Sequence, residues 1–262
     1  SSQDLSLNAF RLDDHLHRLR QSCKLIGFDK TLNLTHLKEN FSSVIRANQF
    51  SEDVAVRVTL LHDDIGSWHS SSPLTYFIAP IRKPRTDIKY LMGLKACISS
   101  WTRISDNVLP PRAKIGANYI NGRFAHLAAK AAGYDLPILL NEHGTVSEGA
   151  GACVFMVKDQ TLITPDNTSS ILESITRDTV ICLASDLGLD VVERAVDRTE
   201  IYLADEVFLC GTAAEITPIC TVDQFSIGNG GVGPVCLSLL RKYHELVSGE
   251  VNKYSHWLSK ID

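Results

Sequence analysis

The sequence predicts an α+β fold in which a few helices interrupt mixed strands, rather than a doubly wound sheet. Apolar stripes with helical spacing occur in separate segments, and short β-branched runs lie between them. The chain has 262 residues, of which 44% are hydrophobic, so it can bury the cores of two domains. A basic, proline-containing break at "RKPRTDIKYLMG" predicts a small domain at 1–85, a connecting loop at 86–92 and a large domain at 93–262.

The small domain is expected to contain two helices followed by two strands. The first helix covers "RLDDHLHRLRQSCKLIGF" and ends near Gly27, and its apolar face is formed by Leu12, Leu16, Leu19 and Cys23. The second helix covers "LTHLKENFSSVIRAN". The segments "VAVRVTLLH" and "LTYFIAPI" are predicted strands, and "DDIGSWHSSSP" is a predicted loop between them.

The large domain is expected to contain more strands than helices. Strands are predicted at "LKACISSWTRIS", "LPILLN", "ACVFMV", "TLITP", "LDVVERAV" and "EVFLCGT". Helices are predicted at "NYINGRFAHLAAKAAG", "ITRDTVICLASDLG" and "PVCLSLLRKYHELVSG". The buried face of the second of these helices should be Val180, Leu183, Ala184 and Leu187. "GNGGVGP" is predicted to be a turn, because no Lys-Ser/Thr follows it and no strand precedes it.

Composition excludes several classes of function. A net charge of −4 argues against a nucleic-acid partner or an anionic membrane partner, and no apolar run is long enough to span a bilayer. The first residues lack the basic start and apolar core of a signal peptide. Seven cysteines without a C-x-x-C pair or a spacing that suits a metal predict a reduced, cytoplasmic chain with no metal site.

The first candidate functional residue is Lys114, in "PPRAKIGANY". Pro110 and Pro111 stiffen its approach, and Gly116 permits a tight turn before the following helix. The positive end of that helix disfavours the protonated amine, and a neutral amine is the form that Schiff-base chemistry needs. An ordinary loop lysine is the competing interpretation of the same pattern.

The second candidate is Glu148, in "NEHGTVSEGAGACVFMV". The small residues Gly149, Ala150 and Gly151 follow it and would let a flat group approach the carboxylate closely. Such a buried acid needs a cationic partner, of which a protonated ring nitrogen is one example. By local reasoning alone, a hairpin turn with an exposed acid is favoured over this interpretation.

Two further segments are suited to binding an anion. The stretch Ser174, Ile175 and Thr176 precedes a predicted helix and offers N–H groups and the helix dipole, although N-capping by Ser174 or Thr176 explains it equally. The strand "EVFLCG" stops at Thr212, where small residues expose backbone N–H groups. A lysine, an acid beside small residues and two anion-binding turns together describe a site for pyridoxal 5'-phosphate.

These motifs identify a family resemblance. The chain resembles the class IV, fold-type IV pyridoxal-phosphate aminotransferases, whose fold is of the D-amino acid aminotransferase type, and it is most similar to the branched-chain amino acid aminotransferases. The resemblance runs from Phe10 to Gly249. It is strongest at "SSWTRISDNVLPPRAKIGANY", "NEHGTVSEGAG", "ILESITRD" and "YLADEVFLCGTAAEITPI".

The resemblance implies a role for each matching residue. Lys114 would be the catalytic residue, forming the internal aldimine and moving the α-proton, and Glu148 would pair with the pyridine nitrogen. Tyr119 would bind the phenolic oxygen of the cofactor, Leu172 would pack on its ring, and Arg18 would bind its phosphate. The other phosphate contacts implied are Ile175, Thr176 and Thr212. Those implied for the substrate are Arg57, Thr212 and Ala213.

The implied reaction is a ping-pong transamination between a branched-chain L-amino acid and a 2-oxo acid such as 2-oxoglutarate, catalysed by a homodimer. A D-amino acid or (R)-amine transaminase, an aminodeoxychorismate lyase or an inert cofactor-binding paralogue would use the same motifs. The chain departs from the family in opening almost at its first helix, so the small domain is expected to lack the usual first strands. It also has Ala152 and Cys153 where the family usually has Glu-Asn, and Ser174 where Gly is usual.

Overall fold

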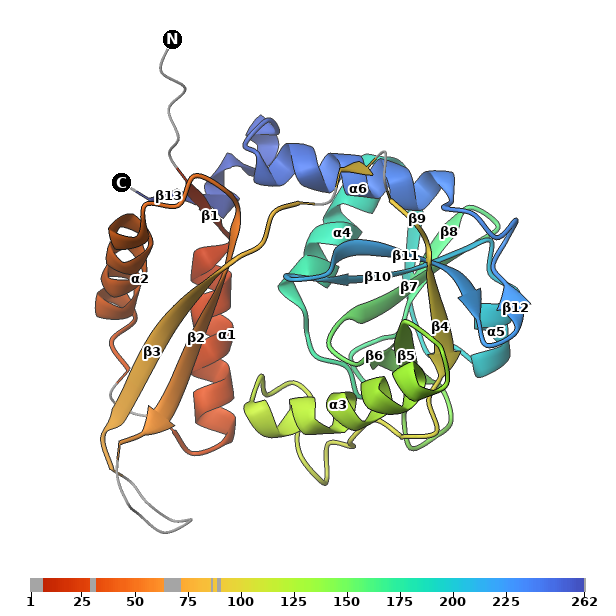
Figure 1. Ribbon diagram of the computed structural model, residues 1–262, viewed down its shortest axis with the longest axis horizontal. Helices are drawn as coiled ribbons and strands as arrows, with labels where there is room; N and C mark the ends of the chain where they lie inside the picture. The colour runs from red at the N-terminus through yellow and green to blue at the C-terminus, as the bar shows by residue number, and fades with distance from the viewer. Residues whose placement is uncertain (1–6, 29–31, 64–71, 86, 89–90, 262) are drawn as a thin grey trace. The chain divides into compact units, whose positions relative to one another are not determined.

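The computed structural model describes residues 7–28, 32–63, 72–85, 87–88 and 91–261. The chain divides into two compact units (Figure 1). One contains Ser1–Thr86 together with Gly249–Asp262, and the other contains Asp87–Ser248. The domain boundaries predicted from the sequence place the C-terminal segment, 249–262, in the large domain. Its contacts lie instead in the first unit, because β13 (Leu258–Lys260) pairs with β1 (Asn8–Phe10) and Ile261 enters the first core.

The first unit packs two helices against one face of a two-stranded antiparallel sheet. Its helices are α1 (Leu12–Leu25) and α2 (Leu34–Asn48), and its strands are β2 (Val54–His62) and β3 (Leu74–Arg82). The buried core residues are Leu12, Leu16, Leu37, Phe41, Ile45 and Ile261. A short 3-10 helix, η2 (Asn252–Trp257), leads into β13.

The predicted helices and strands of this unit agree with the structure. The predicted second helix has the same bounds as α2, whose first turn is capped by Asn33, because its side chain accepts a 3.1 Å hydrogen bond from His36 N. Leu19 is less deeply buried than the rest of the predicted face of α1. Most of the predicted loop between the two strands, including Trp68, lies outside the described residues.

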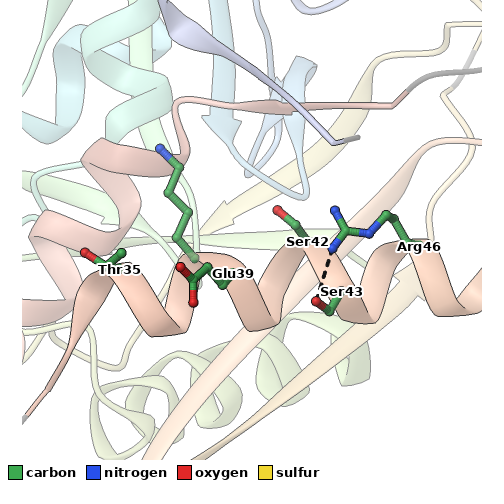
Figure 2. A pocket seen from close by; sticks show the side chains of 6 residues that line it. Thr35, Glu39, Ser42, Ser43 and Arg46 are labelled. Carbon is green, nitrogen blue, oxygen red and sulfur yellow. Dashed lines mark hydrogen bonds between the residues drawn. The ribbon is translucent and has the colours of Figure 1, made fainter.

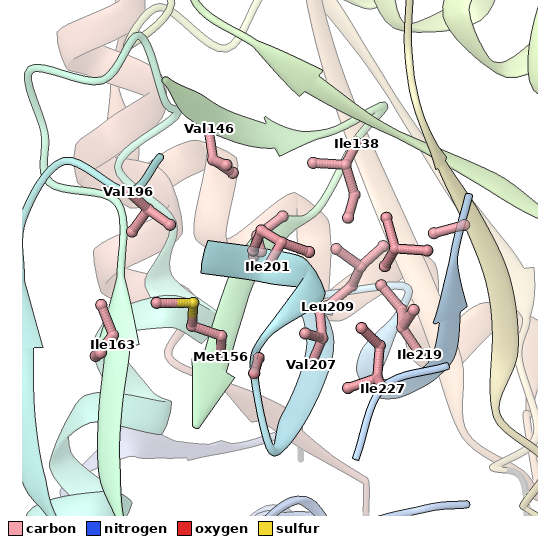
Figure 3. Packing of buried hydrophobic residues seen from close by; sticks show 14 of the residues in the cluster. Ile138, Val146, Met156, Ile163, Val196, Ile201, Val207, Leu209, Ile219 and Ile227 are labelled. Carbon is pink, nitrogen blue, oxygen red and sulfur yellow. The ribbon is translucent and has the colours of Figure 1, made fainter. Parts of the chain in front are cut away.

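The second unit is built on a mixed sheet whose strands run in the order β10-β11-β4-β5-β6-β7-β8-β9. An additional pairing of β10 with β7 joins two strands of this path and closes a ring, and β12 extends β11. The strands are β4 (Leu94–Ile98), β5 (Leu136–Leu140), β6 (Val146–Gly149), β7 (Cys153–Lys158), β8 (Thr161–Thr164), β9 (Asp190–Glu193), β10 (Glu206–Gly211), β11 (Glu215–Val222) and β12 (Phe225–Ser226). The ring of strands encloses an apolar core, which Figure 3 shows with Ile138, Met156, Leu209 and Ile219 packed together.

The described residues of this unit form four α-helices: α3 (Gly116–Ala131), α4 (Ile175–Asp186), α5 (Arg198–Tyr202) and α6 (Pro234–Val247). Helix α3 packs on β5, whereas α4 and α6 pack on each other and on β10 (Figure 1). Two side chains fix the starts of these helices. Ser174 caps α4 by accepting from Arg177 N at 3.3 Å, and the buried Glu206 accepts from Val235 N and Cys236 N of α6 at 2.9 and 2.8 Å.

The structure corrects several sequence expectations for the second unit. The predicted strand "LDVVERAV" ends at Glu193, and Leu187 is 38% exposed because it is the C-cap of α4 and lies past the buried face. Strand β11 and helix α5 were not expected. Glu148 lies in strand β6 and is buried, so the expectation of an exposed acid in a hairpin turn was wrong.

Candidate active site

Lys114 lies on a turn that buried hydrogen bonds hold in place. The turn precedes α3, and Lys114 itself is exposed. The side chain of Asn118, from the first turn of α3, is 3% exposed and donates to the carbonyls of Pro110 and Ala113 at 3.0 and 2.8 Å. Because Ala113 directly precedes Lys114, these two hydrogen bonds fix the point from which the lysine side chain leaves the backbone.

Glu148 lies on the same side of the unit with a carboxylate that is fully enclosed. Its Oε1 pairs with Arg103 Nη2 at 2.8 Å, and its Oε2 accepts from Leu172 N at 3.1 Å. The Sγ of Cys153 is 4.0 Å from the same Oε2. Arg103 Nη1 also donates to Asn118 O at 3.4 Å. Arg103 therefore connects Glu148 to α3, the helix that follows the Lys114 turn.

The proton affinity of Glu148 reflects two opposing influences. Burial disfavours the charged form and raises the pKa of Glu148 to about 7. The charge of Arg103, the Leu172 N–H group and the charge of Lys114 oppose this shift. Since Lys114 contributes to the pKa of Glu148, the two side chains lie close enough to interact electrostatically. Near neutral pH the buried Glu148 carboxyl group is only about half ionised. A further cationic hydrogen-bond donor would therefore stabilise its ionised form.

Glycines allow α3 to lie directly against the turn that follows β6. A Cβ at Gly122 would lie far inside van der Waals contact with the carbonyl oxygen of Ala150. A Cβ at Gly151 would be 3.5 Å from the ring of Tyr119, which is 41% exposed. Tyr119, on the helix that follows Lys114, therefore lies beside the turn that follows the strand of Glu148.

Two further predicted segments of this unit are connected to the surroundings of Glu148. Leu172 contacts Glu148 through its N–H group, and α4 begins three residues later at Ile175 and Thr176. Gly211, just before Thr212, packs near Ala152, since a Cβ there would be 3.6 Å from the Ala152 methyl group. Both Thr212 and Ala213 are exposed.

Arg18 and Arg57 belong to the first unit, so the cluster around Glu148 comes from the second unit alone. Arg18 is 8% exposed, and its Nη2 is 3.4 Å from His15 Nδ1. Arg57 is exposed on β2, opposite Ala79 of β3.

Sequence reasoning missed Arg103 and Asn118. The requirement that a buried acid have a cationic partner was recognised, but nothing in the sequence connects Glu148 to an arginine 45 residues earlier. Asn118 lies within the motif "GANY", where the tyrosine alone was given a role. An asparagine in the first turn of a helix that follows a diproline turn is the signal that could have pointed to it.

A surface hollow of about 300 Å³ lies along α2 in the first unit (Figure 2). Its lining side chains all come from that one helix and are Thr35, Lys38, Glu39, Ser42, Ser43 and Arg46. Its two basic groups are engaged, because Lys38 Nζ bonds to Asp13 at 2.6 Å and Arg46 Nη2 to Ser43 at 3.2 Å. The hollow shares no residue with the cluster around Glu148, which remains the candidate active site.

The described residues show no other type of site. Among them, no three His, Cys, Asp or Glu side chains are grouped as metal ligands. None of the described helices combines the length and the apolar character that a membrane-spanning helix needs.

Comparison with known proteins identifies the family. Residues 6–222 match the family described as amino-transferase class IV. The chain belongs to this family. As a class IV aminotransferase, it is similar to proteins named as branched-chain-amino-acid aminotransferases. The branched-chain-amino-acid aminotransferase of Salmonella typhimurium is 38% identical over 259 residues, which are 97% of this chain and 83% of that protein.

Solved structures of the family share its fold. The branched-chain amino acid aminotransferase of Thermobaculum terrenum, in its PLP-bound holo form, has a TM-score of 0.91 and 44% identity, covering 98% of this chain and 84% of the other. The T.th. branched-chain amino acid aminotransferase with pyridoxamine 5'-phosphate has a TM-score of 0.94 and 34% identity, covering 99% of this chain and 86% of the other. The predicted α+β, fold-type IV architecture is thereby confirmed.

Proposed function

We propose that this class IV aminotransferase uses pyridoxal 5'-phosphate to exchange amino groups between branched-chain L-amino acids and a 2-oxo acid such as 2-oxoglutarate. The observation that carries the proposal is the pair formed by Lys114, exposed on a fixed turn, and Glu148, buried close to it. Relatives with aldehyde and amine forms of the cofactor, PLP and pyridoxamine 5'-phosphate, support it, because a transaminase must pass through both.

The residues present suit this cofactor. Glu148 has two oxygens anchored by Arg103 and Leu172 and a pKa of about 7, so a cationic ring N–H facing it would stabilise the ionised carboxylate. The bound cofactor supplies an aldehyde that exchanges amino groups and a ring that withdraws electrons from the substrate α-carbon.

In this proposal Lys114 is the catalytic residue. Its Nζ would hold the cofactor covalently until the substrate amine displaces it, and the freed amine would then move the proton from the substrate α-carbon to the cofactor carbon that receives the amino group. The Asn118 hydrogen bonds keep the base of this side chain still during both tasks. Tyr119, in the first turn of α3, would donate to the phenolic oxygen of the cofactor, and Leu172 would pack against the ring.

Anion-binding groups hold the phosphate and the substrate. We assign the phosphate to the first N–H groups of α4 at Ile175 and Thr176, to Thr212, and to Arg18 of the first unit. Thr212 and Ala213 also present backbone groups to the substrate carboxylate, and Arg57 binds the side chain of an acidic co-substrate.

The proposed assembly is a homodimer in the cytoplasm. Helix α3 exposes apolar side chains at one face, with Ile120, Phe124 and Leu127 at 47–51% exposure and Trp101 stacked 5.1 Å from Phe124. Contiguous apolar patches of this kind mark interfaces. All seven cysteines are free thiols, as expected in a reducing compartment. Light scattering should give the mass of a dimer, and a monomer at micromolar concentration would contradict the assembly.

The activity is tested with a panel of L- and D-amino acids and 2-oxoglutarate. L-leucine, L-isoleucine and L-valine should be converted to 2-oxo acids, and the visible absorbance of the bound cofactor should bleach when the donor is added. Lys114→Ala should abolish turnover, whereas Lys130→Ala, near the C-terminal end of α3, should not. Turnover of D-amino acids alone, or cofactor binding without bleaching, would refute the proposal.

A further inference from the structure

The turn between β10 and β11 contains a residue in an uncommon backbone conformation. Glu215, which follows "GTAA", has a φ of 51°, in the left-handed region that few residues other than glycine adopt. Such a conformation persists only where the surrounding structure holds it, and residues of this kind are concentrated at ligand-binding turns. What holds Glu215 is therefore relevant to the turn that presents Thr212 and Ala213.

A histidine from α6 anchors this residue. His244 Nε2 lies 2.9 Å from Glu215 Oε2, and the two side chains are only 17% and 25% exposed. Nε2 can carry a hydrogen in the charged ring and in one neutral tautomer, so the contact does not require a protonated histidine. Helix α6 packs on β10 and β11, and thus offers a fixed point from which to hold the turn between them.

The contact also controls where a negative charge lies. Glu215 is two residues from Ala213, and a carboxylate turned toward the backbone N–H groups of the turn would compete with an incoming anion for them. Pairing with His244 directs that carboxylate toward α6 instead. On the other side of Glu215, Thr217 Oγ1 donates to Ala214 O at 2.7 Å and closes the turn.

We propose that His244 and Glu215 are positioning residues, which hold the 211–215 turn in the conformation that binds the carboxylate of the amino acid and 2-oxo acid substrates. The proposal rests on the proposed function, in which Thr212 and Ala213 bind that carboxylate. Neither His244 nor Glu215 contacts the substrate, and both act through the backbone of the turn.

The first experiment compares His244→Gln with His244→Asn. The glutamine Nε2 can occupy the position of the histidine Nε2, whereas the shorter asparagine cannot reach Glu215. His244→Asn and Glu215→Ala should each raise the KM for L-leucine and for 2-oxoglutarate by about tenfold, which corresponds to the loss of one shielded polar contact, with kcat changed less than threefold. His244→Gln should stay within about threefold of the wild-type KM.

Two controls separate positioning from folding. Lys242→Gln removes the 2.6 Å ion pair of Lys242 with Glu245 on the same helix, and should leave both KM values unchanged. The double variant His244→Asn, Glu215→Ala should be no worse than either single variant, because both remove one shared contact. Additive effects in this cycle, or a His244→Asn protein with wild-type KM values, would overturn the proposal.

Amide hydrogen exchange of the cofactor-free protein tests the same idea without turnover. Residues 211–217 should exchange faster in His244→Asn than in the wild-type or His244→Gln proteins, and equal rates would refute the anchoring. If the wild-type protein does not transaminate but the exchange rates differ as expected, the proposed function fails while the anchor stands. If it transaminates and the rates are equal, the anchor alone fails.

Discussion

Glu148 should make the stability of the cofactor-free protein fall as pH rises. The pKa of Glu148 is about 7 in the folded protein and 4.5 for an unperturbed side chain, so between these values the folded chain holds a proton that the unfolded chain has lost. The contribution is fully present below pH 4.5 and is lost as pH rises to 7. The difference of about 2.5 pKa units, at 1.36 kcal/mol each, amounts to about 3 kcal/mol.

Urea denaturation between pH 4.5 and pH 8.5 measures this contribution by comparing the wild-type protein with Glu148→Gln. Groups common to both proteins cancel in the difference between them. The unfolding free energy of the wild type minus that of Glu148→Gln should fall by about 3 kcal/mol between pH 4.5 and pH 7 and then remain level. Glu142→Gln, which removes an exposed carboxylate from the loop before β6, controls for the change in net charge. Parallel stability curves for wild type and Glu148→Gln would show that Arg103 keeps the acid ionised throughout, and would refute the reasoning.

Three further substitutions test the scaffold of the site. Asn118→Ala should remove the side-chain donor that joins the carbonyls of Pro110 and Ala113, lowering stability by about 1–3 kcal/mol and kcat by at least tenfold, whereas unchanged kcat would rule out its role in holding Lys114. Gly122→Ala should push α3 away from Ala150 and lower the thermal midpoint, while Gly116→Ala, which has open space around it, should be nearly neutral; equal midpoints would contradict the close packing. Glu206→Ala should cost about 1–3 kcal/mol in urea denaturation by uncapping α6, and a loss below 0.5 kcal/mol would contradict the capping.

Local sequence patterns predicted most individual elements. Helix α2 was located to the residue because a clear apolar stripe runs through its whole length. Strand β11 was missed because "EITPICTV" contains a proline and follows the preceding strand after a very short turn. The parallel pairing of β11 with β4 could not be predicted, since no local pattern connects segments so far apart in the chain.

The candidate site divides in the same way. Lys114 and Glu148 were singled out by local context, a diproline turn and a run of small residues, but local reasoning alone favoured an exposed acid at Glu148. The roles of Tyr119, Leu172 and Arg18 came from the family resemblance, and they remain proposals. Arg103 was missed because its importance depends on its ion pair with Glu148, which is distant in the sequence.

The position of β4 between β5 and β11 has a consequence for how the chain emerges from a ribosome. One edge of β4 pairs with β11, which is synthesised more than a hundred residues later. Until then the growing chain has an unpaired strand edge at Leu94–Ile98. We expect refolding of the second unit to be slow and prone to aggregation at high protein concentration, with closure of the ring of strands as its last step.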